Sequence, residues 1–287
     1  MRRIVVTGGN KGIGKAICTQ ILTSYPNTFV YLGSRDKDRG TAAVVDVLNE
    51  IGEQFKNQIE LLLIDVGDSQ SVASAAAAVK QACGPNSLYG VVNNAGIGGG
   101  TALELCNVNL YGVKRVCDSF IPLLQDGGRV INVSSGSAPM FVNSLPTDQQ
   151  AFWDTGTDAT WEQLDARIQE KVYRDETDPN PTPGSGMPSY YGFSKACLNV
   201  YTMQMAQIHP GLQINSVSPG WIQTDMVAKY FGGFPDGTKP VAEGTKSSLH
   251  CLFGEAVDVK SGCYYGSDAV RSPLNYMRSP GSPAFNP

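Results

Sequence analysis

Histidine is scarce in this sequence: His209 and His250 are the two among 287 residues. Zinc centres built on imidazole ligands and Ser-His-Asp hydrolytic sites both need histidine beside other ligands or partners in one constellation. Neither histidine has such neighbours in the sequence, and His209 precedes a proline at the expected end of a helix. The sequence therefore predicts no metal site and no histidine-based triad.

An excess of positive charge is also absent, with 22 Lys and Arg against 26 Asp and Glu, a net charge of −4. This balance argues against a general nucleic-acid binder. No apolar run approaches the roughly 20 residues that span a bilayer. Residues 1–6 lead straight into a glycine-rich turn, without the apolar region of a signal peptide. We therefore expect neither a nucleic-acid nor a membrane partner.

The sequence also lacks cysteines at the paired spacings of a disulfide framework. The seven cysteines lie mostly within apolar segments, at positions 18, 83, 106, 117, 197, 251 and 263. Unpaired thiols in apolar surroundings are typical of reduced core cysteines. The sequence therefore predicts a cytoplasmic protein without a disulfide framework.

A glycine-rich turn, Thr7–Gly14, stands between the β-branched run Arg3–Val6 and a helical apolar pattern. Strand, glycine turn and helix are the start of a dinucleotide-binding βαβ unit. Gly8 permits the tight turn, Gly12 lets the backbone approach a pyrophosphate, and Gly14 allows the helix to pack closely on the strand. The N-terminus of that helix presents free N–H groups and a positive dipole end to phosphates.

The residues that follow the second strand, Phe29–Ser34, are those that discriminate between NAD and NADP. An arginine near this point suits a 2′-phosphate, whereas a carboxylate suits an unphosphorylated ribose. Arg35 and Arg39 follow the strand and Lys11 lies in the glycine turn, which favours NADP(H). Two alternatives stay open: Asp36 could face the ribose as in NAD enzymes, or the arginines could be solvated loop charges.

Polar or small residues also follow the next strands of the chain. The strand and edge segments are Ile59–Ile64 with Asp65-Val66, Leu88–Val92 with Asn93–Gly96, and Gly128–Val133 with Ser134-Ser135. Alternating strands and helices predict a parallel sheet covered on both faces, with ligands beyond the carboxyl ends of the strands. We therefore predict an α/β fold, a Rossmann-type doubly wound parallel sheet of about seven strands, in one domain over residues 1–287.

Tyr191 and Lys195 lie four residues apart in a predicted helix, so their side chains share one face. A free tyrosine titrates near pH 10, and a neighbouring ammonium stabilises the phenolate and lowers this pKa. A serine hydroxyl, such as Ser135 or its neighbour Ser134, can hold and polarise a reacting carbonyl oxygen.

Asn109 sits inside a predicted helix over 103–124, either as a purposeful irregularity or as an exposed polar position.

With these motifs the chain resembles the short-chain dehydrogenase/reductase family over about residues 3–265. The resemblance rests on Thr7–Gly14, Asn93–Gly96, Asn109, Ser135 and Tyr191-x-x-x-Lys195. It implies that Tyr191 is the general acid in reduction and that Lys195 tunes it and holds the nicotinamide ribose. It also implies that Ser135 positions the carbonyl and that Asn109 supports a water-linked proton relay.

Together with the glycine turn, the resemblance indicates which residues bind ligands. The cofactor residues are expected to be Gly8, Asn10, Lys11, Gly12, Ile13, Gly14, Arg35, Arg39, Asp65, Val66, Asn93, Ala95, Gly96, Tyr191, Lys195, Pro219, Gly220, Ile222 and Thr224. The substrate residues are expected to be Ser135, Tyr191, Trp221 and Met226. Simple loop packing is an alternative role for Trp221.

Two segments depart from the common family pattern. Residues 136–190 separate Ser135 from Tyr191, and two capping boxes and an apolar stripe predict one or two helices followed by a proline-rich return over 179–188. This insert is similar to that of the monomeric NADPH-dependent carbonyl reductases, which implies a monomer; the plant menthone- and salutaridine-type reductases are an alternative. The extension 266–287 departs from the carbonyl reductases and is expected to wrap the surface or border the site.

The expected function is NADPH-dependent reduction of a ketone, aldehyde or quinone to an alcohol. Alternatives are a narrow-specificity alcohol dehydrogenase or ketone reductase of secondary metabolism, including one that works mainly in the oxidative direction, and a catalytically silent NADP(H)-binding sensor. The intact Ser135, Tyr191 and Lys195 set argues against the sensor.

Overall fold

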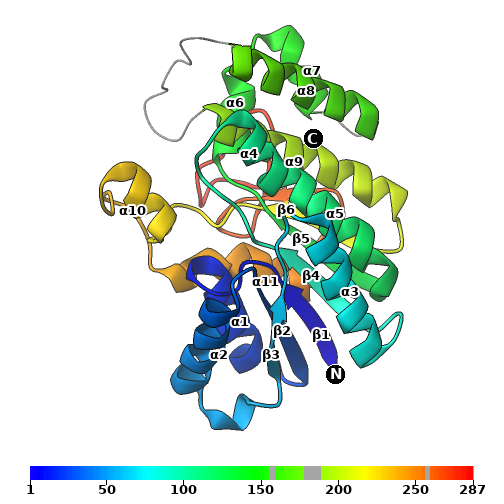
Figure 1. The fold of residues 1–287 in the computed structure, drawn as a ribbon. Helices are drawn as coiled ribbons and strands as arrows, with labels where there is room; N and C mark the ends of the chain where they lie inside the picture. The colour runs from blue at the N-terminus through cyan, green and yellow to red at the C-terminus, as the bar shows by residue number, and fades with distance from the viewer. Residues whose placement is uncertain (155–158, 178–188, 256–258, 287) are drawn as a thin grey trace.

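The computed structural model describes residues 1–154, 159–177, 189–255 and 259–286. Within them the centre of the molecule is an eight-stranded sheet of order β3-β2-β1-β4-β5-β6-β7-β8 (Figure 1). The strands are β1 (Arg2–Val6), β2 (Thr28–Ser34), β3 (Ile59–Leu63), β4 (Leu88–Asn93), β5 (Leu124–Val133), β6 (Gln213–Val217), β7 (Tyr264–Tyr265) and β8 (Arg271–Ser272). All neighbours pair in parallel except β7 and β8, which are antiparallel.

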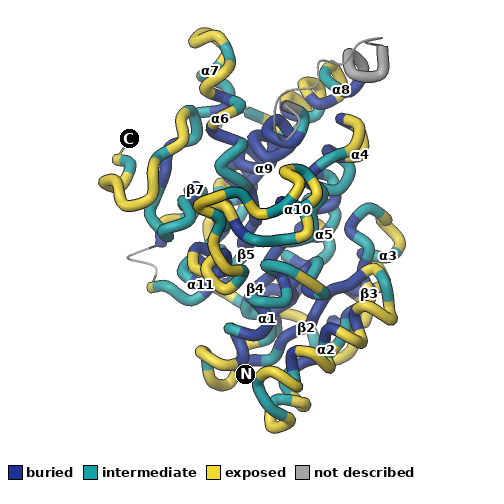
Figure 2. Tube along the Cα trace, turned by 90° about the vertical axis from the view of Figure 1, so that its left-hand side faces the viewer, coloured by how far each residue is buried: buried dark blue, intermediate teal, exposed yellow. Residues whose placement is uncertain are grey.

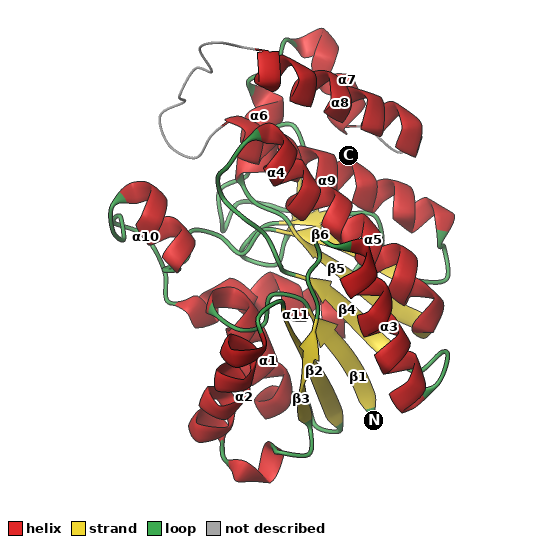
Figure 3. Ribbon diagram, in the orientation of Figure 1, coloured by secondary structure: helices red, strands yellow, loops and turns green. Residues whose placement is uncertain are grey.

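Helices cover both faces of this sheet (Figure 3). They are α1 (Gly12–Ser24), α2 (Lys37–Ile51), α3 (Ser69–Cys83), α4 (Ala102–Cys106), α5 (Gly112–Phe120), α6 (Ser137–Asn143), α7 (Thr147–Asp154), α8 (Trp161–Thr177), α9 (Ser189–Ile208), α10 (Asp225–Phe231) and α11 (Lys246–Phe253). The core beside α1, α2 and α11 is separate from the core beside α3, α5 and α9. The predicted doubly wound Rossmann-type fold is confirmed, and β8 adds one strand to the seven expected.

Alternation along the strands explains the two cores. Successive strand residues point to opposite faces. In β1, Ile4 and Val6 enter the core beside α1 and α2, whereas Val5 enters the core beside α3 and α5. The buried centre of the molecule is continuous along these strands, as the dark tube in Figure 2 shows. Because helices cover both faces of such a sheet, ligands bind beyond the carboxyl ends of its strands.

The predicted helix over 103–124 is wrong as one continuous element. It divides into α4, a π-helical segment η2 (Asn107–Tyr111), α5 and a 3₁₀ turn η3 (Ile121–Leu123). Pro122 accounts for the last change, because proline supplies no N–H for a helical hydrogen bond. Strand β5 then starts at Leu124, four residues before the predicted start at Gly128.

In the part of the insert that the structure describes there are three helices, α6 to α8, rather than one or two. The predicted capping box at α8 is formed: Thr160 N donates to Gln163 Oε1 at 2.9 Å, and Gln163 N donates to Thr160 Oγ1 at 3.3 Å. At α7, Gln150 donates to the Leu145 carbonyl at 2.9 Å. The proline-rich return over 179–188 lies outside the described residues.

Candidate active site

The ends of β1 and β4 are joined by side-chain hydrogen bonds. Asn94 Nδ2 donates to the carbonyl oxygens of Thr7 at 3.0 Å and of Gly8 at 3.1 Å. In return, Thr7 Oγ1 accepts from the backbone N–H groups of Asn94 and Ala95, both at 3.1 Å. The two asparagines have different roles, because Asn93 turns into the core and donates to Asn132 Oδ1 at 2.9 Å. The glycine turn is therefore fixed to the neighbouring strand.

The glycine turn has the conformation that a pyrophosphate site needs. Gly8 and Gly12 have φ values of +63° and +53°, a region that favours glycine. A Cβ on Gly14 would lie 2.3 Å from the Gly8 carbonyl oxygen, so α1 packs directly on the turn. Helix α1 has neither a side-chain N-cap hydrogen bond nor an acidic residue in its first turn, so its N–H groups are open to an anion. A dinucleotide fits this site.

Some of the charged residues expected at the ribose are engaged in contacts with other side chains or with the backbone, and one faces solvent. Asp36 caps α2, accepting from Arg39 N at 2.9 Å, and its other oxygen lies 3.3 Å from Arg39 Nε. Arg35 is exposed beside this cap. Lys11 Nζ forms an ion pair with Asp225 Oδ2 at 2.7 Å, and this contact holds the pKa of Asp225 below its usual value. Asp36 is thus engaged in helix capping, while Arg35 faces solvent.

The segment after β3 is held by Arg115, a residue that the sequence did not single out. Asp65 Oδ1 accepts from Gly67 N at 2.9 Å, and Val66 is buried. Arg115 Nη1 donates to the carbonyls of Val66 and Asn107, both at 3.2 Å. One guanidinium therefore joins the expected cofactor residues after β3 to the π-helical segment η2.

Tyr191 and Lys195 lie near the start of α9 and are 6% and 5% exposed. A Cβ on Gly192 would lie 2.8 Å from the Ser137 carbonyl oxygen, so α6 crosses α9 closely beside the tyrosine. Lys195 Nζ donates to the Val133 carbonyl at 2.8 Å and lies 5.8 Å from the centre of the Tyr191 ring. The end of β5 thereby fixes the ammonium beside the phenol.

The ionisation of both groups is set by burial. Removal from water lowers the pKa of Lys195 to about 8, because burial disfavours the ammonium. Burial raises the pKa of Tyr191, and a hydrogen bond with Ser135 opposes this rise. Since the neutral forms are favoured, a protonated phenol is available as an acid near neutral pH.

The two serines after β5 point in different directions. Ser134 is buried and its Oγ donates to the Lys195 carbonyl at 3.3 Å. The Ser135 hydroxyl accepts from Ser137 N at 3.1 Å and makes a hydrogen bond with Tyr191. The geometry therefore favours Ser135 over Ser134 as the hydroxyl beside the phenol.

Asn109 lies in η2 and is fully buried, so the exposed alternative is wrong. Its Nδ2 donates to the Ile97 carbonyl at 3.0 Å and to Ser194 Oγ at 3.1 Å, and its Oδ1 accepts from Ile97 N at 2.9 Å. Ser194 Oγ in turn donates to the Tyr191 carbonyl at 2.8 Å. This asparagine links the loop after β4 to α9, and Ser194 is a link that the sequence analysis missed.

The loop after β6 supplies the remaining expected residues. Gly220 follows Pro219 with φ +89°, and its N–H donates to Ser218 Oγ at 3.3 Å. Ile222 is 2% exposed, so its side chain belongs to the interior. Thr224 caps α10, accepting from Val227 N at 3.4 Å. The Ile222 side chain is thus not exposed to a ligand.

The two expected substrate residues, Trp221 and Met226, border the site differently. Trp221 is 47% exposed and packs edge-on against Phe231, with ring centres 5.6 Å apart. Met226 meets the loop after β4: a Cβ on Gly98 would lie 2.8 Å from its Cγ. Tyr230, also on α10, packs on Gly99 in the same way. Helix α10 therefore rests on the loop that leads to Asn109.

Two kinds of feature are absent from the residues that the structure describes. No helix there combines the length and apolar character needed to cross a membrane. No group of three or more His, Cys, Asp or Glu side chains is placed to hold a metal ion.

Comparison with known proteins agrees with this geometry. The family model for short chain dehydrogenase matches residues 2–146. The chain is 32% identical to (+)-neomenthol dehydrogenase of Arabidopsis thaliana, covering 94% of this chain and 97% of that one. It is 29% identical to human carbonyl reductase [NADPH] 1, covering 86% and 88%. The structure of salutaridine reductase from Papaver somniferum superposes with a TM-score of 0.79 and 28% identity, covering 92% and 99%. The chain belongs to the short chain dehydrogenase family and is an oxidoreductase that acts on alcohol and carbonyl groups.

Proposed function

We propose that this protein uses NADPH to reduce the carbonyl of a ketone, aldehyde or quinone to an alcohol. The observation that carries the proposal is that Tyr191, Ser135 and Lys195 meet in a buried site. This site lies at the carboxyl edge of the sheet, the edge at which the glycine turn also lies. Bound NADPH supplies the hydride. The chain's own part is to orient the carbonyl and to give its oxygen a proton.

The proton is proposed to come from Tyr191. Ser135 and Tyr191 can both donate to a carbonyl oxygen placed between them, which polarises that carbonyl. As negative charge develops on this oxygen, the phenol releases its proton to it. Lys195, held by the Val133 carbonyl at 2.8 Å, stabilises the resulting phenolate.

The preference for NADPH is supported by the charges at the expected ribose site. Asp36 is engaged in capping α2 and in contact with Arg39, so it is poorly placed to hold a ribose diol. Arg35 and Lys11 are exposed cations that can pair with a 2′-phosphate, Lys11 after release from Asp225. The name of the human carbonyl reductase contains NADPH, which agrees with this proposal.

Turnover of NADPH and NADH with aromatic aldehydes, quinones and alicyclic ketones tests the proposed function. We expect reduction with NADPH at a kcat/KM at least tenfold above that with NADH. A preference for NADH contradicts the cofactor assignment. Tight NADPH binding without turnover of any carbonyl supports the sensor alternative instead. The relatives named for neomenthol and salutaridine favour cyclic ketones as the first substrates to test.

Removing the Arg35 charge is expected to lower the affinity for NADPH. A charge-assisted hydrogen bond contributes about 1.5–3 kcal/mol, so Arg35→Ala should raise the KM for NADPH roughly 10- to 100-fold. The KM for NADH should change less than about threefold, because that cofactor has no 2′-phosphate. Exposed Lys37, two residues further along the chain, provides the matched control Lys37→Ala. Equal changes for both cofactors contradict the assignment.

We also propose that the protein is a cytoplasmic monomer. The insert helix α8 packs against α4 and α9, and its Asp165 accepts a hydrogen bond from the Tyr111 hydroxyl of η2. The faces beneath the insert are therefore covered within one chain. Sedimentation should give a single species near 30.6 kDa over a wide concentration range. A tetramer that persists on dilution contradicts this proposal.

A further inference from the structure

The extension that the family resemblance leaves unexplained forms a closed strap over residues 271–285. It begins at β8, where Ser272 pairs with Tyr264 and Arg271 with Tyr265. It returns to its own start through Phe285 N, which donates to the Arg271 carbonyl at 3.0 Å. The C-terminal strap is therefore an ordered addition to the edge of the sheet.

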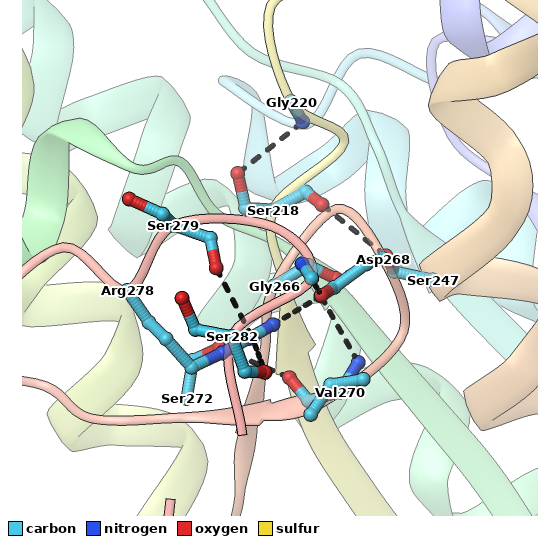
Figure 4. A network of polar contacts seen from close by, with 11 residues as sticks. Ser218, Gly220, Ser247, Gly266, Asp268, Val270, Ser272, Arg278, Ser279 and Ser282 are labelled. Carbon is cyan, nitrogen blue, oxygen red and sulfur yellow. Dashed lines mark hydrogen bonds and ion pairs between the residues drawn. The ribbon is translucent and has the colours of Figure 1, made fainter. Parts of the chain in front are cut away.

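A buried ion pair holds the middle of the strap. The Arg278 and Asp268 side chains are in contact and are 4% and 16% exposed (Figure 4). Arg278 Nε also donates to Ser272 Oγ at 3.0 Å, and its Nη1 donates to the Ser282 carbonyl at 2.6 Å. The second Asp268 oxygen accepts from Gly281 N at 2.8 Å. Because all these groups pair within the strap and its adjoining turn, one conformation is strongly specified.

Met277 is adjacent to Arg278 and lies against the turn formed by Ser135 and Gly136. A Cβ on Gly136, the residue after Ser135, would lie 3.4 Å from Met277 Cε and 3.5 Å from its Sδ. Met277 is nevertheless 55% exposed, and the adjacent Tyr276 is 47% exposed. The ion pair thus positions an apolar side chain beside the residue that follows Ser135, with about half of its surface exposed.

The strap also reaches the insert. Asn275 Nδ2 donates to Asp154 Oδ2 at 3.0 Å at the end of α7. The turn after β5 also approaches the end of β6: Ser218 Oγ lies 4.0 Å from the Cβ position of Gly136 and accepts from Gly220 N at 3.3 Å. Residues 275–278 therefore bridge the insert and the turn that follows β5.

We propose that Met277 is a specificity-determining residue, which forms an apolar wall of the substrate site and selects ketones whose carbonyl is part of, or attached to, a bulky alicyclic or aromatic ring. This inference rests on the proposed carbonyl reduction. Half-exposed Trp221 lies on the loop after β6, the strand that neighbours β5. A flexible thioether on one side and an indole nearby suit a large apolar ring better than a short chain.

The first test compares ring ketones with small ketones. Met277→Ala should lower kcat/KM with NADPH for a substituted cyclohexanone about tenfold, mainly through KM, and change that for butan-2-one less than about twofold. Met277→Leu should restore most of the selectivity, since it restores apolar volume. Ile208→Ala, at the exposed end of α9, is the matched control. Equal changes for both ketones overturn the inference while leaving the proposed reduction intact.

The second test needs no turnover. In Met277→Cys, alkylation of the new thiol by a bimane reagent should slow at least fivefold when NADP⁺ and the cyclic ketone are both present. Ile208→Cys should show no such protection, and the wild-type protein gives the background from its own cysteines. Unprotected alkylation at saturating ketone overturns the inference. A wild-type protein that reduces aldehydes or quinones but no ketone overturns the inference alone, whereas one that reduces no ketone, aldehyde or quinone overturns the proposed function and the inference with it.

Discussion

Replacing Tyr191 by phenylalanine is expected to lower kcat for carbonyl reduction by about 10²–10⁴-fold, the usual contribution of a positioned general acid. The substitution removes one oxygen from a ring that is 6% exposed and leaves the packing of α9 in place. It removes the proton that neutralises the developing alkoxide and the group whose ionised form Lys195 stabilises. The loss should therefore appear in kcat, with little change in cofactor affinity.

The experiment measures steady-state reduction together with NADPH binding by calorimetry. Tyr190 offers the matched control, because it is the adjacent tyrosine on the same helix and its ring packs 5.0 Å from Lys171 Nζ rather than beside Lys195. Tyr190→Phe should keep kcat within about threefold. A Tyr191→Phe enzyme that retains a tenth or more of the wild-type kcat excludes Tyr191 as the proton donor.

Much of the site could be predicted from the sequence because its local patterns have simple physical causes. A positive φ at Gly8 and the close approach of α1 at Gly14 each require glycine, so the turn is visible as glycine spacing. The four-residue separation of Tyr191 and Lys195 places both on one helix face. The alternating strands and helices predicted the sheet and therefore the edge at which these groups meet.

The contacts that escaped prediction join distant parts of the chain. Asn109 bonds to Ile97 and Ser194, and this network coincides with the π-helical interruption that helix periodicity did not reveal. Arg115 joins the loop after β3 to η2 through backbone carbonyls, which every residue carries whatever its type. The Arg278 and Asp268 pair joins the strap to the turn between β7 and β8. Propensity and spacing do not encode such partners.

Lys195→Met is expected to remove most turnover and also to change how stability depends on pH. The folded-state pKa of Lys195 is lowered by burial from 10.5 to about 8. Between these values the unfolded chain binds more protons than the folded one, so this residue makes the wild-type free energy of unfolding rise with pH. Below pH 8 the buried ammonium destabilises the fold by about 3 kcal/mol relative to pH above 10.5.

Methionine fills a similar volume without this charge, so the variant should lack that part of the pH dependence. Urea unfolding at pH 7.5, 9 and 10 should show the variant's stability, relative to wild type, greatest at pH 7.5 and declining as pH rises. Loss of the hydrogen bond to the Val133 carbonyl adds an offset at every pH and does not alter this trend. Lys229→Met, at an exposed lysine on α10, controls for the removal of one positive charge. A stability difference that stays constant across this range contradicts an ammonium held in a desolvated site, and with it the electrostatic role proposed for Lys195 beside Tyr191.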